Sequence, residues 1–454
     1  MLRTSFLKWD RPFLSRLFNL SLPIMLQSLF GVLGSAITTL MVGQLGDIPL
    51  AAAGLSNQLF FILSLVQFGI ASGCSIFTAQ FWGKQDTTSI LKVLGVGSVM
   101  GFTAGGCFAV IALFIPRYFL QIFTTDQQVV QLGMTMLRIT GISYLFTPVI
   151  INYSLILRTT GNVRLPMLVS TSGVILNIIL GFILVFGKLG LPAMGAQGAA
   201  YANLIARVCE CLLLAWMIYL YKTPLAASPR KIFSFSRQFL KRILHKVTPV
   251  MFNELLWSLG ISAYAAIYAH ISTESIAAIS IKDSLENLIF VPFLGITHAC
   301  AIMVGNTIGS GKKEKSYGFV SQSVKVALIM AVVLGTGIGI FRHFIISLYK
   351  ITDLTRFFAQ NLLLIQAIML WVRTLNLVFF IGMMRSGGDT RFAYWMDVGA
   401  MWLVGVPMAL LGAFVFKLPV YGVYLMVMVE EVLKLIISIC RYRSRRWIHD
   451  LVTA

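Results

Sequence analysis

Charged residues are scarce in this sequence, and acidic residues are scarcer than basic ones. Only 11% of the 454 residues are charged, whereas soluble proteins carry about 25%. Hydrophobic residues make up 58% of the chain, and the mean hydropathy is +0.86. This composition excludes an ordinary soluble domain and predicts an integral membrane protein.

Motifs for nucleotide binding and for hydrolysis are also missing. The sequence has no GxxxxGK[ST] phosphate loop, no HExxH and no GxSxG. We therefore expect no nucleotide partner, no direct use of ATP and no enzymatic activity. The six cysteines lie in or at the ends of apolar stretches, and their spacing demands neither a disulfide nor a structural metal. We expect no cofactor.

What the chain does have is a series of long apolar stretches, a pattern typical of a helical bundle and not of an outer-membrane barrel. Twelve transmembrane helices are predicted, at residues 17–44, 48–81, 88–115, 127–158, 165–187, 195–221, 247–269, 275–308, 316–347, 356–386, 391–415 and 419–440.

The net charge of +20 is distributed by membrane side. With the amino terminus placed inside, 24 basic residues fall in inner segments and 6 in outer loops. This bias is the positive-inside pattern, which predicts a multi-pass membrane protein with both termini in the cytoplasm. The lipid bilayer therefore accounts for the basic charge, and we expect no nucleic acid partner.

The first half of the sequence repeats in the second. A shift of 226 places Pro23 on Pro249, Gly34 on Gly260 and Gly69 on Gly295 without a gap. Six helices per half is an even number, so the halves are predicted to be parallel repeats. The fold class is an all-α membrane protein of two six-helix lobes. The predicted parts are an amino-terminal lobe (1–221), a basic cytoplasmic linker (222–246) and a carboxyl-terminal lobe (247–454).

Two lobes with polar groups near the midplane are typical of secondary transporters that work by alternating access. The acids are concentrated accordingly: seven of the eight inside predicted helices or at their inner ends lie in the second half. A carboxylate inside the bilayer is costly and marks a functional site by default. We predict cation or proton coupling through acids of the carboxyl-terminal lobe.

Glu254 is the leading candidate for this role. It lies about 12 Å along its helix from Lys246, inside the hydrocarbon. Asp397 is predicted at a similar depth, and Asp283 and Asp389 complete the set. None of Glu254, Asp397 and Asp283 has a basic residue three or four positions away. Asp389 lies in a Gly-Gly turn between two arginines, where a capping or salt-bridge role is an equal alternative.

Four further acids have basic neighbours at helical spacing, which favours structural ion pairs on one helix face. These acids are Glu210, Glu286, Glu430 and Glu431, near Arg207, Lys282 and Lys434.

Several stretches, taken in order, resemble the multidrug and toxic compound extrusion (MATE) transporters. They are residues 22–58, LRTTGNVRLPM (157–167), residues 176–207, the pair Asn253 and Glu254, MRSGGDTRF (384–392) and WLVGVP (402–407). The resemblance covers nearly the whole chain. It implies a V-shaped, twelve-helix protein that exports cationic, aromatic or amphipathic compounds in exchange for inward Na⁺ or H⁺.

The resemblance has one departure. Many bacterial members carry an acid in the first helix, where this chain has Thr38, so a proton site there is not expected. Glu254 matches the seventh-helix acid of other members.

A buried carboxylate avoids an unpaired charge by taking up a proton or by holding a cation. Asn253 and Asp397, with Glu254, are the predicted oxygen ligands if the coupling ion is Na⁺. Asn177, Trp257 and Tyr264, again with Glu254, are the predicted contacts for organic cations, because aromatic faces attract cations. A monomer suffices for this mechanism. The alternative is a flippase of a lipid-linked saccharide or cell-wall precursor, which calls for a basic central cavity.

Overall fold

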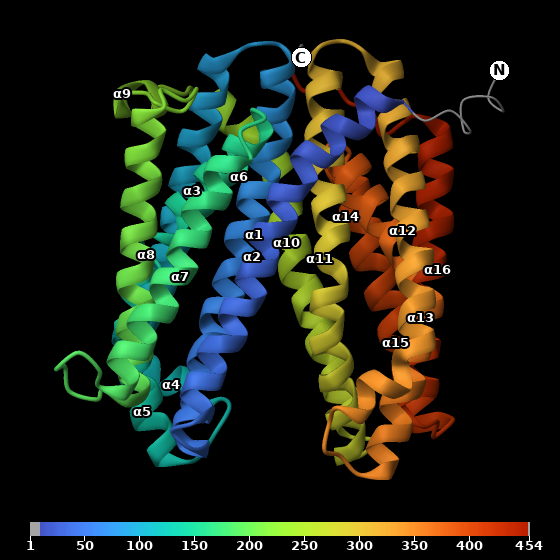
Figure 1. The fold of residues 1–454 in the computed structure, drawn as a ribbon. Coiled ribbons are helices and arrows are strands. Elements are labelled where there is room, and N and C mark those ends of the chain that lie inside the picture. The colour runs from blue at the N-terminus through green and yellow to red at the C-terminus, as the bar shows by residue number, and fades with distance from the viewer. Residues whose placement is uncertain (1–9, 453–454) are drawn as a thin grey trace. The chain divides into compact units, whose positions relative to one another are not determined.

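The computed structural model describes residues 10–452, and within them the secondary structure is helical, with no strand (Figure 1). The α-helices of the first half are α1 (Arg11–Gly43), α2 (Asp47–Gly83), α3 (Thr87–Phe114), α4 (Pro116–Gln121), α5 (Gln127–Ser143), α6 (Thr147–Thr159), α7 (Arg164–Phe186), α8 (Gly195–Leu220) and α9 (Pro229–Ile232). Those of the second half are α10 (Arg237–Ala269), α11 (Thr273–Gly309), α12 (Lys313–Ser347), α13 (Asp353–Leu377), α14 (Thr390–Ala400), α15 (Val406–Leu410) and α16 (Val420–Ser444). Three π-helical segments interrupt the second half: η1 (Val378–Arg385), η2 (Met401–Gly405) and η3 (Leu411–Val415).

These helices match the twelve predicted spans. Within residues 10–452, ten helical segments are long and apolar enough to cross a membrane. The pair α5 and α6, bent by 46° at its break, corresponds to the single predicted span 127–158. The twelfth, α16, carries Glu430, Glu431 and Lys434 in its middle and is therefore less apolar than the others. Arg3 and Lys8, two of the basic residues counted in the inner segments, lie outside the described residues.

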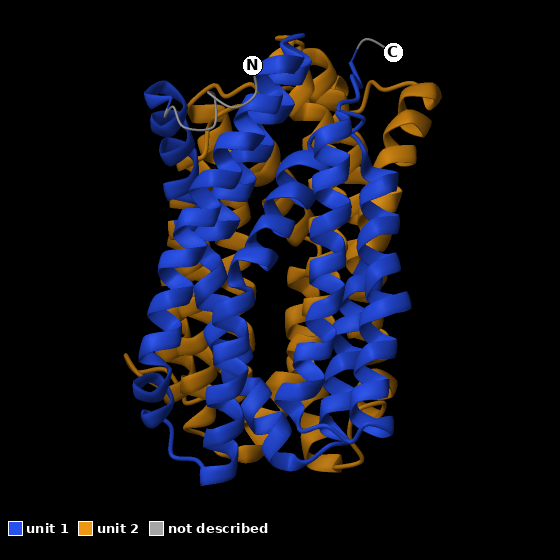
Figure 2. Ribbon diagram, turned by 90° about the vertical axis from the view of Figure 1, so that its right-hand side faces the viewer, with its two compact units in different colours: residues 1–25, 255–454 blue, residues 26–254 orange. Residues whose placement is uncertain are grey.

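The chain divides into two compact units, which Figure 2 shows in separate colours. Unit 1 consists of residues 1–25 and 255–454, and unit 2 of residues 26–254. Both boundaries fall inside helices, one in α1 and one in α10. The first part of α1 thus groups with the second half of the chain, and the first part of α10 with the first half.

The helices of the two halves repeat closely. Both α1 and α10 have 33 residues, and both α2 and α11 have 37, and each pair is offset by 226 positions. Equivalent glycines allow equivalent close contacts. A Cβ on Gly69 of α2 would lie 2.7 Å from the Cα of Met251 in α10. A Cβ on Gly295 of α11 would lie 2.9 Å from the Ser21 carbonyl oxygen in α1. The missing side chain lets the helices pack closely.

The predicted linker 222–246 is only partly a connection. Helix α10 begins at Arg237, ten residues before the predicted span. Phe239 stacks on Phe81 of α2 with ring centroids 6.4 Å apart, and Ile243 is fully buried. The basic residues of this part are interspersed with apolar ones that pack inside unit 2, so the helix continues beyond the predicted hydrocarbon boundary.

An apolar core in unit 1 holds the helices that carry most of the buried charge. It joins α10, α11, α13 and α16 through residues that include Ile267, Tyr268, Ala278, Leu362, Leu363, Val427 and Met428. Because these side chains fix the four helices against one another, polar groups on their facing sides are held in defined positions.

Candidate functional site

A stripe of exposed polar side chains runs along the amino-terminal part of α11. Ser280, Asp283, Ser284 and Asn287 are exposed and recur at three- and four-residue spacing, so they share one face of the helix. The Asp283 side chain is 56% exposed. At a rise of ~1.5 Å per residue it lies about 15 Å from the start of the 37-residue helix α11 and about 12 Å from the middle of that helix, so it lies within a ~30 Å hydrocarbon layer centred on the helix but close to its edge.

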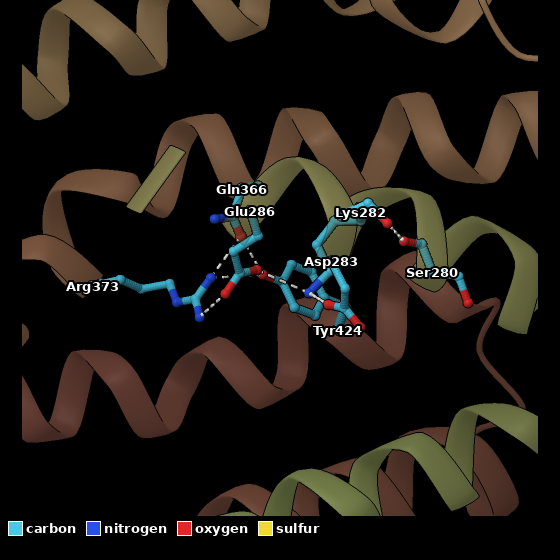
Figure 3. Close-up of polar contacts among 8 residues, drawn as sticks. Ser280, Lys282, Asp283, Glu286, Gln366, Arg373 and Tyr424 are labelled. Carbon is cyan, nitrogen blue, oxygen red and sulfur yellow. Dashed lines mark hydrogen bonds and ion pairs between the residues drawn. The ribbon is translucent and has the colours of Figure 1, made fainter. Parts of the chain in front are cut away.

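Lys282 lies directly beside this stripe and is buried. Its Nζ atom is 2.5 Å from Asp283 Oδ1 and 3.0 Å from Glu286 Oε2. The ammonium group is therefore shared between an exposed carboxylate and a largely buried one, as Figure 3 shows. Figure 3 also labels Ser280 of the stripe on the same helix.

The buried carboxylate of Glu286 has a second cationic partner. Arg373 of α13 donates from Nη2 to Glu286 Oε1 at 2.5 Å and from Nη1 to Gln366 Oε1 at 2.8 Å. Tyr424 of α16 donates its hydroxyl hydrogen to the same Gln366 oxygen at 2.6 Å. The Lys282 ammonium lies 4.9 Å from the centre of the Tyr424 ring. Three helices are thereby joined by one charge-balanced network of two cations and two carboxylates.

A second buried polar group in unit 1 joins α10, α14 and α16. Tyr264 donates to Glu430 Oε2 at 2.5 Å, and the other Glu430 oxygen pairs with Lys434. Lys434 Nζ is also 2.7 Å from Asp397 Oδ1. The backbone of Gly405 in η2 packs directly on the Tyr264 and Glu430 side chains, and a methyl group there would overlap both.

Asp389 belongs to a different environment, at the turn between η1 and α14. Its Oδ2 is 2.7 Å from Arg441, and its Oδ1 is 3.5 Å from His449 Nε2. The backbone N–H of His449 donates to the Gly387 carbonyl oxygen at 2.8 Å, which holds the carboxyl-terminal tail on this turn. These contacts are those of the salt-bridge alternative.

Glu254 and Asn253 are buried in α10 and belong to unit 2. A Cβ on Gly69 of α2 would lie 3.3 Å from Glu254 Cγ, so this acid packs against the second helix of the first half. The structure therefore groups Glu254 with unit 2, whereas Asp283, Asp389 and Asp397 all lie in unit 1.

The three residues predicted to contact substrate differ in their surroundings. Asn177 lies half-buried in α7, and its Oδ1 atom is buried without a hydrogen-bond partner among the described residues. Trp257 of α10 is 36% exposed. Tyr264 is buried, and its hydroxyl group donates a hydrogen bond to Glu430, which holds the tyrosine side chain in place.

Sequence spacing found some of these pairs and missed others. Three of the four acids predicted to pair on their own helix do so, in Lys282–Glu286, Lys434–Glu430 and Arg207–Glu210. The fourth, Glu431, accepts a hydrogen bond from Asn376 of another helix at 2.7 Å. Asp283 and Asp397, predicted to have no basic partner at helical spacing, are paired by an adjacent residue and by another helix. Arg373, Gln366 and Tyr424 were not predicted; the signal available was an arginine inside an apolar span, which requires a partner.

Known proteins resemble this chain in both sequence and fold. The sequence profile of the MatE family matches residues 23–183 and 249–411, one match in each half of the chain. An uncharacterised transporter of Bacillus subtilis, YisQ, is 26% identical over 434 residues, which cover 95% of this chain and 94% of that protein. YoeA of the same organism, named a probable multidrug resistance protein, is 27% identical and covers 92% and 91%.

Solved structures share the fold. A variant of the Vibrio cholerae MATE transporter VcmN superimposes with a TM-score of 0.88 at 18% identity, covering 99% of each chain. A MOP superfamily transporter from Pyrococcus furiosus superimposes with a TM-score of 0.87 at 20% identity, covering 98% of each. These structures confirm the predicted twelve-helix, two-lobed fold.

Proposed function

The chain belongs to the MatE family, and on that premise we propose that it is a multidrug efflux antiporter. It exports cationic and amphipathic organic compounds by alternating access, in exchange for inward movement of Na⁺ or H⁺. Relatives such as YoeA support this proposal. YoeA is named a probable multidrug resistance protein, and the match to this chain covers 91% of its length.

The observation that carries the proposal is the polar stripe on α11. An ionised carboxylate that is 56% exposed on a membrane-crossing helix favours water over the hydrocarbon, because a charged side chain inside the hydrocarbon costs several kcal/mol. Asp283 therefore faces a water-filled path through the membrane protein. A negative charge flanked by Ser280, Ser284 and Asn287 suits a cation that also needs hydrogen-bond acceptors.

Coupling is proposed to run through carboxylates that change their partner. Asp283 and Asp397 each pair with a lysine, so a proton or Na⁺ competes with an ammonium group at both. Glu254 with Asn253 forms a separate buried candidate in unit 2. Occupation of these acids by the ion favours one state of the transport cycle, and occupation by drug favours the other.

The proposed setting is the bacterial inner membrane, with both termini in the cytoplasm and a monomer as the working unit. The positive-inside distribution of basic residues supports this orientation.

The contacts favour a drug exporter over a flippase for phosphate-bearing lipids. Three of the basic residues inside unit 1, Lys282, Arg373 and Lys434, are paired with carboxylates. A phosphate ligand would have to displace these carboxylates from their cations.

Ethidium efflux from proteoliposomes tests the proposal, with a Na⁺ gradient and a pH gradient imposed in separate experiments. We expect one of the two gradients to drive ethidium efflux. We expect the Glu254→Gln variant to fold but to show no gradient-driven efflux. Efflux that ignores both gradients would contradict the antiport. Efflux that survives unchanged in Glu254→Gln would remove Glu254 from the coupling set.

A further inference from the structure

We propose that Lys282 is a resident competitor of the transported cation, and that it sets how tightly Asp283 holds a substrate. This inference rests on the proposed function, because it takes Asp283 as the residue that meets organic cations. It assigns Lys282 a specificity-determining role toward the organic substrate, at an acid that the coupling proposal also uses.

The first observation is the sharing of one ammonium group. Lys282 Nζ is 2.5 Å from Asp283 Oδ1, although adjacent residues on a helix do not normally face each other. The buried lysine side chain reaches sideways to the exposed carboxylate. An organic cation arriving at Asp283 therefore finds its site already held by a cation that belongs to the protein.

The second observation is that Lys282 has a partner to keep when it is displaced. Its ammonium is 3.0 Å from Glu286 Oε2, and the Glu286 side chain is only 18% exposed. When Lys282 is displaced from Asp283, its ammonium group still has the Glu286 carboxylate as a partner. The costly outcome, a buried ammonium group without a carboxylate, is therefore avoided. Exchange at Asp283 requires only that a lysine already anchored on Glu286 give up its second contact.

The third observation is the charge balance behind Asp283. Lys282, Arg373 and Glu286 together carry one net positive charge, which Asp283 neutralises (Figure 3). When substrate takes up the charge of Asp283, this trio opposes a second positive charge beside it. The arrangement weakens substrate binding and favours release, which a transporter needs at the end of each cycle.

The repeat supplies an internal comparison for this arrangement. In α2 the positions equivalent to Lys282, Asp283 and Glu286 are Ser56, Asn57 and Phe60. The Ser56 hydroxyl donates to the Gly133 carbonyl oxygen, a contact that links helices without charge. A helix of the same length and position thus packs without the lysine or the acids, so packing alone does not require Lys282.

The experiment measures the dissociation constant of tetraphenylphosphonium for the purified full-length protein and for four variants. We expect Lys282→Gln to bind about tenfold more tightly, because one neighbouring positive charge changes the cation affinity of a carboxylate by about tenfold or more. The charge-conserving control Lys282→Arg keeps the wild-type affinity. Asp283→Asn binds at least tenfold more weakly, and Lys282→Gln combined with Asp283→Asn matches Asp283→Asn alone.

Thermal unfolding accompanies each binding measurement. Lys282→Gln leaves Arg373 and Glu286 as a neutral pair and Asp283 in water, so we expect a folded protein. In transport assays the tighter binding of Lys282→Gln lowers both KM and kcat. Unchanged or weaker binding by folded Lys282→Gln would overturn the inference. A wild-type protein that neither binds nor transports organic cations would instead overturn the proposed function.

Discussion

The two units contain helices of matching length and matching order, yet they bury very different side chains. Helix α2 of unit 2 and helix α11 of unit 1 both have 37 residues, and both pack through an equivalent glycine, Gly69 or Gly295. Beyond the first turn, only α11 carries a lysine and two carboxylates, which are Lys282, Asp283 and Glu286. Because α2 folds at the same positions without them, these charges are not demanded by the fold.

The difference extends to the neighbouring helices. In unit 1, α13, α14 and α16 add Arg373, Asp397 and a glutamate–lysine pair to the interior. In unit 2, Arg207 pairs with Glu210, and its arginine side chain is 30% exposed. Buried ion pairs contribute little net stability, since desolvation offsets attraction. The buried pairs of unit 1 therefore support the proposed handling of ions and substrate in this unit.

Removing Arg373 should have the largest effect on stability. Arg373→Ala takes a cation from buried Glu286 and a donor from Gln366, which should lower the free energy of unfolding by about 3–5 kcal/mol. Arg356→Ala on the same helix is the matched control and should cost less than about 1 kcal/mol, because its partner Asp353 is 98% exposed. Thermal unfolding in detergent measures both. Equal losses would contradict the difference between the buried and the exposed ion pair.

The hydroxyl group of Tyr264 provides a smaller test at equivalent positions. Tyr264→Phe removes a hydrogen bond to the Glu430 carboxylate and should cost about 1.5–3 kcal/mol. Its repeat equivalent, Thr38, donates only to the Gly34 carbonyl oxygen of its own helix. Thr38→Val should therefore cost about 0.5–1 kcal/mol. Denaturant unfolding of the two variants compares them, and a larger loss in Thr38→Val would refute the ranking.

Surface charge should matter least, even within unit 1. Arg445 and Glu314 pair at 2.6 Å, but their side chains are 48% and 78% exposed. Arg445→Ala should change the unfolding free energy by less than about 1 kcal/mol, with the difference shrinking further at high salt. Unfolding at low and high ionic strength checks this, and a salt-independent loss of several kcal/mol would be inconsistent with it.

Hydropathy predicted the twelve spans because each helix must cover the same hydrocarbon thickness. The internal repeat predicted which helices of the two halves would be equivalent. The four-residue spacing along a single helix predicted the ion pairs Lys282–Glu286 and Lys434–Glu430. Pairs between helices were beyond reach: Arg373 is 87 positions from Glu286, and only packing brings them together. The early start of α10 was missed because its basic residues were assigned to a linker.

The grouping of Glu254 shows a similar limit. Its position in the sequence assigned it to the second half, but its neighbour in space is Gly69 of α2. A helix that crosses from one unit to the other divides its residues between them, and no pattern along one chain reveals where the division falls.

The most direct measurement exchanges one side chain between equivalent helices. Asp283→Asn, Asn57→Asp and the double variant are assayed for gradient-driven ethidium efflux in proteoliposomes, with folding checked by thermal unfolding. The polar stripe of α11 predicts that Asp283→Asn lowers efflux at least tenfold and that Asn57→Asp does not restore it. Wild-type efflux by folded Asp283→Asn, or full rescue by Asn57→Asp, would contradict a cation path that depends on unit 1.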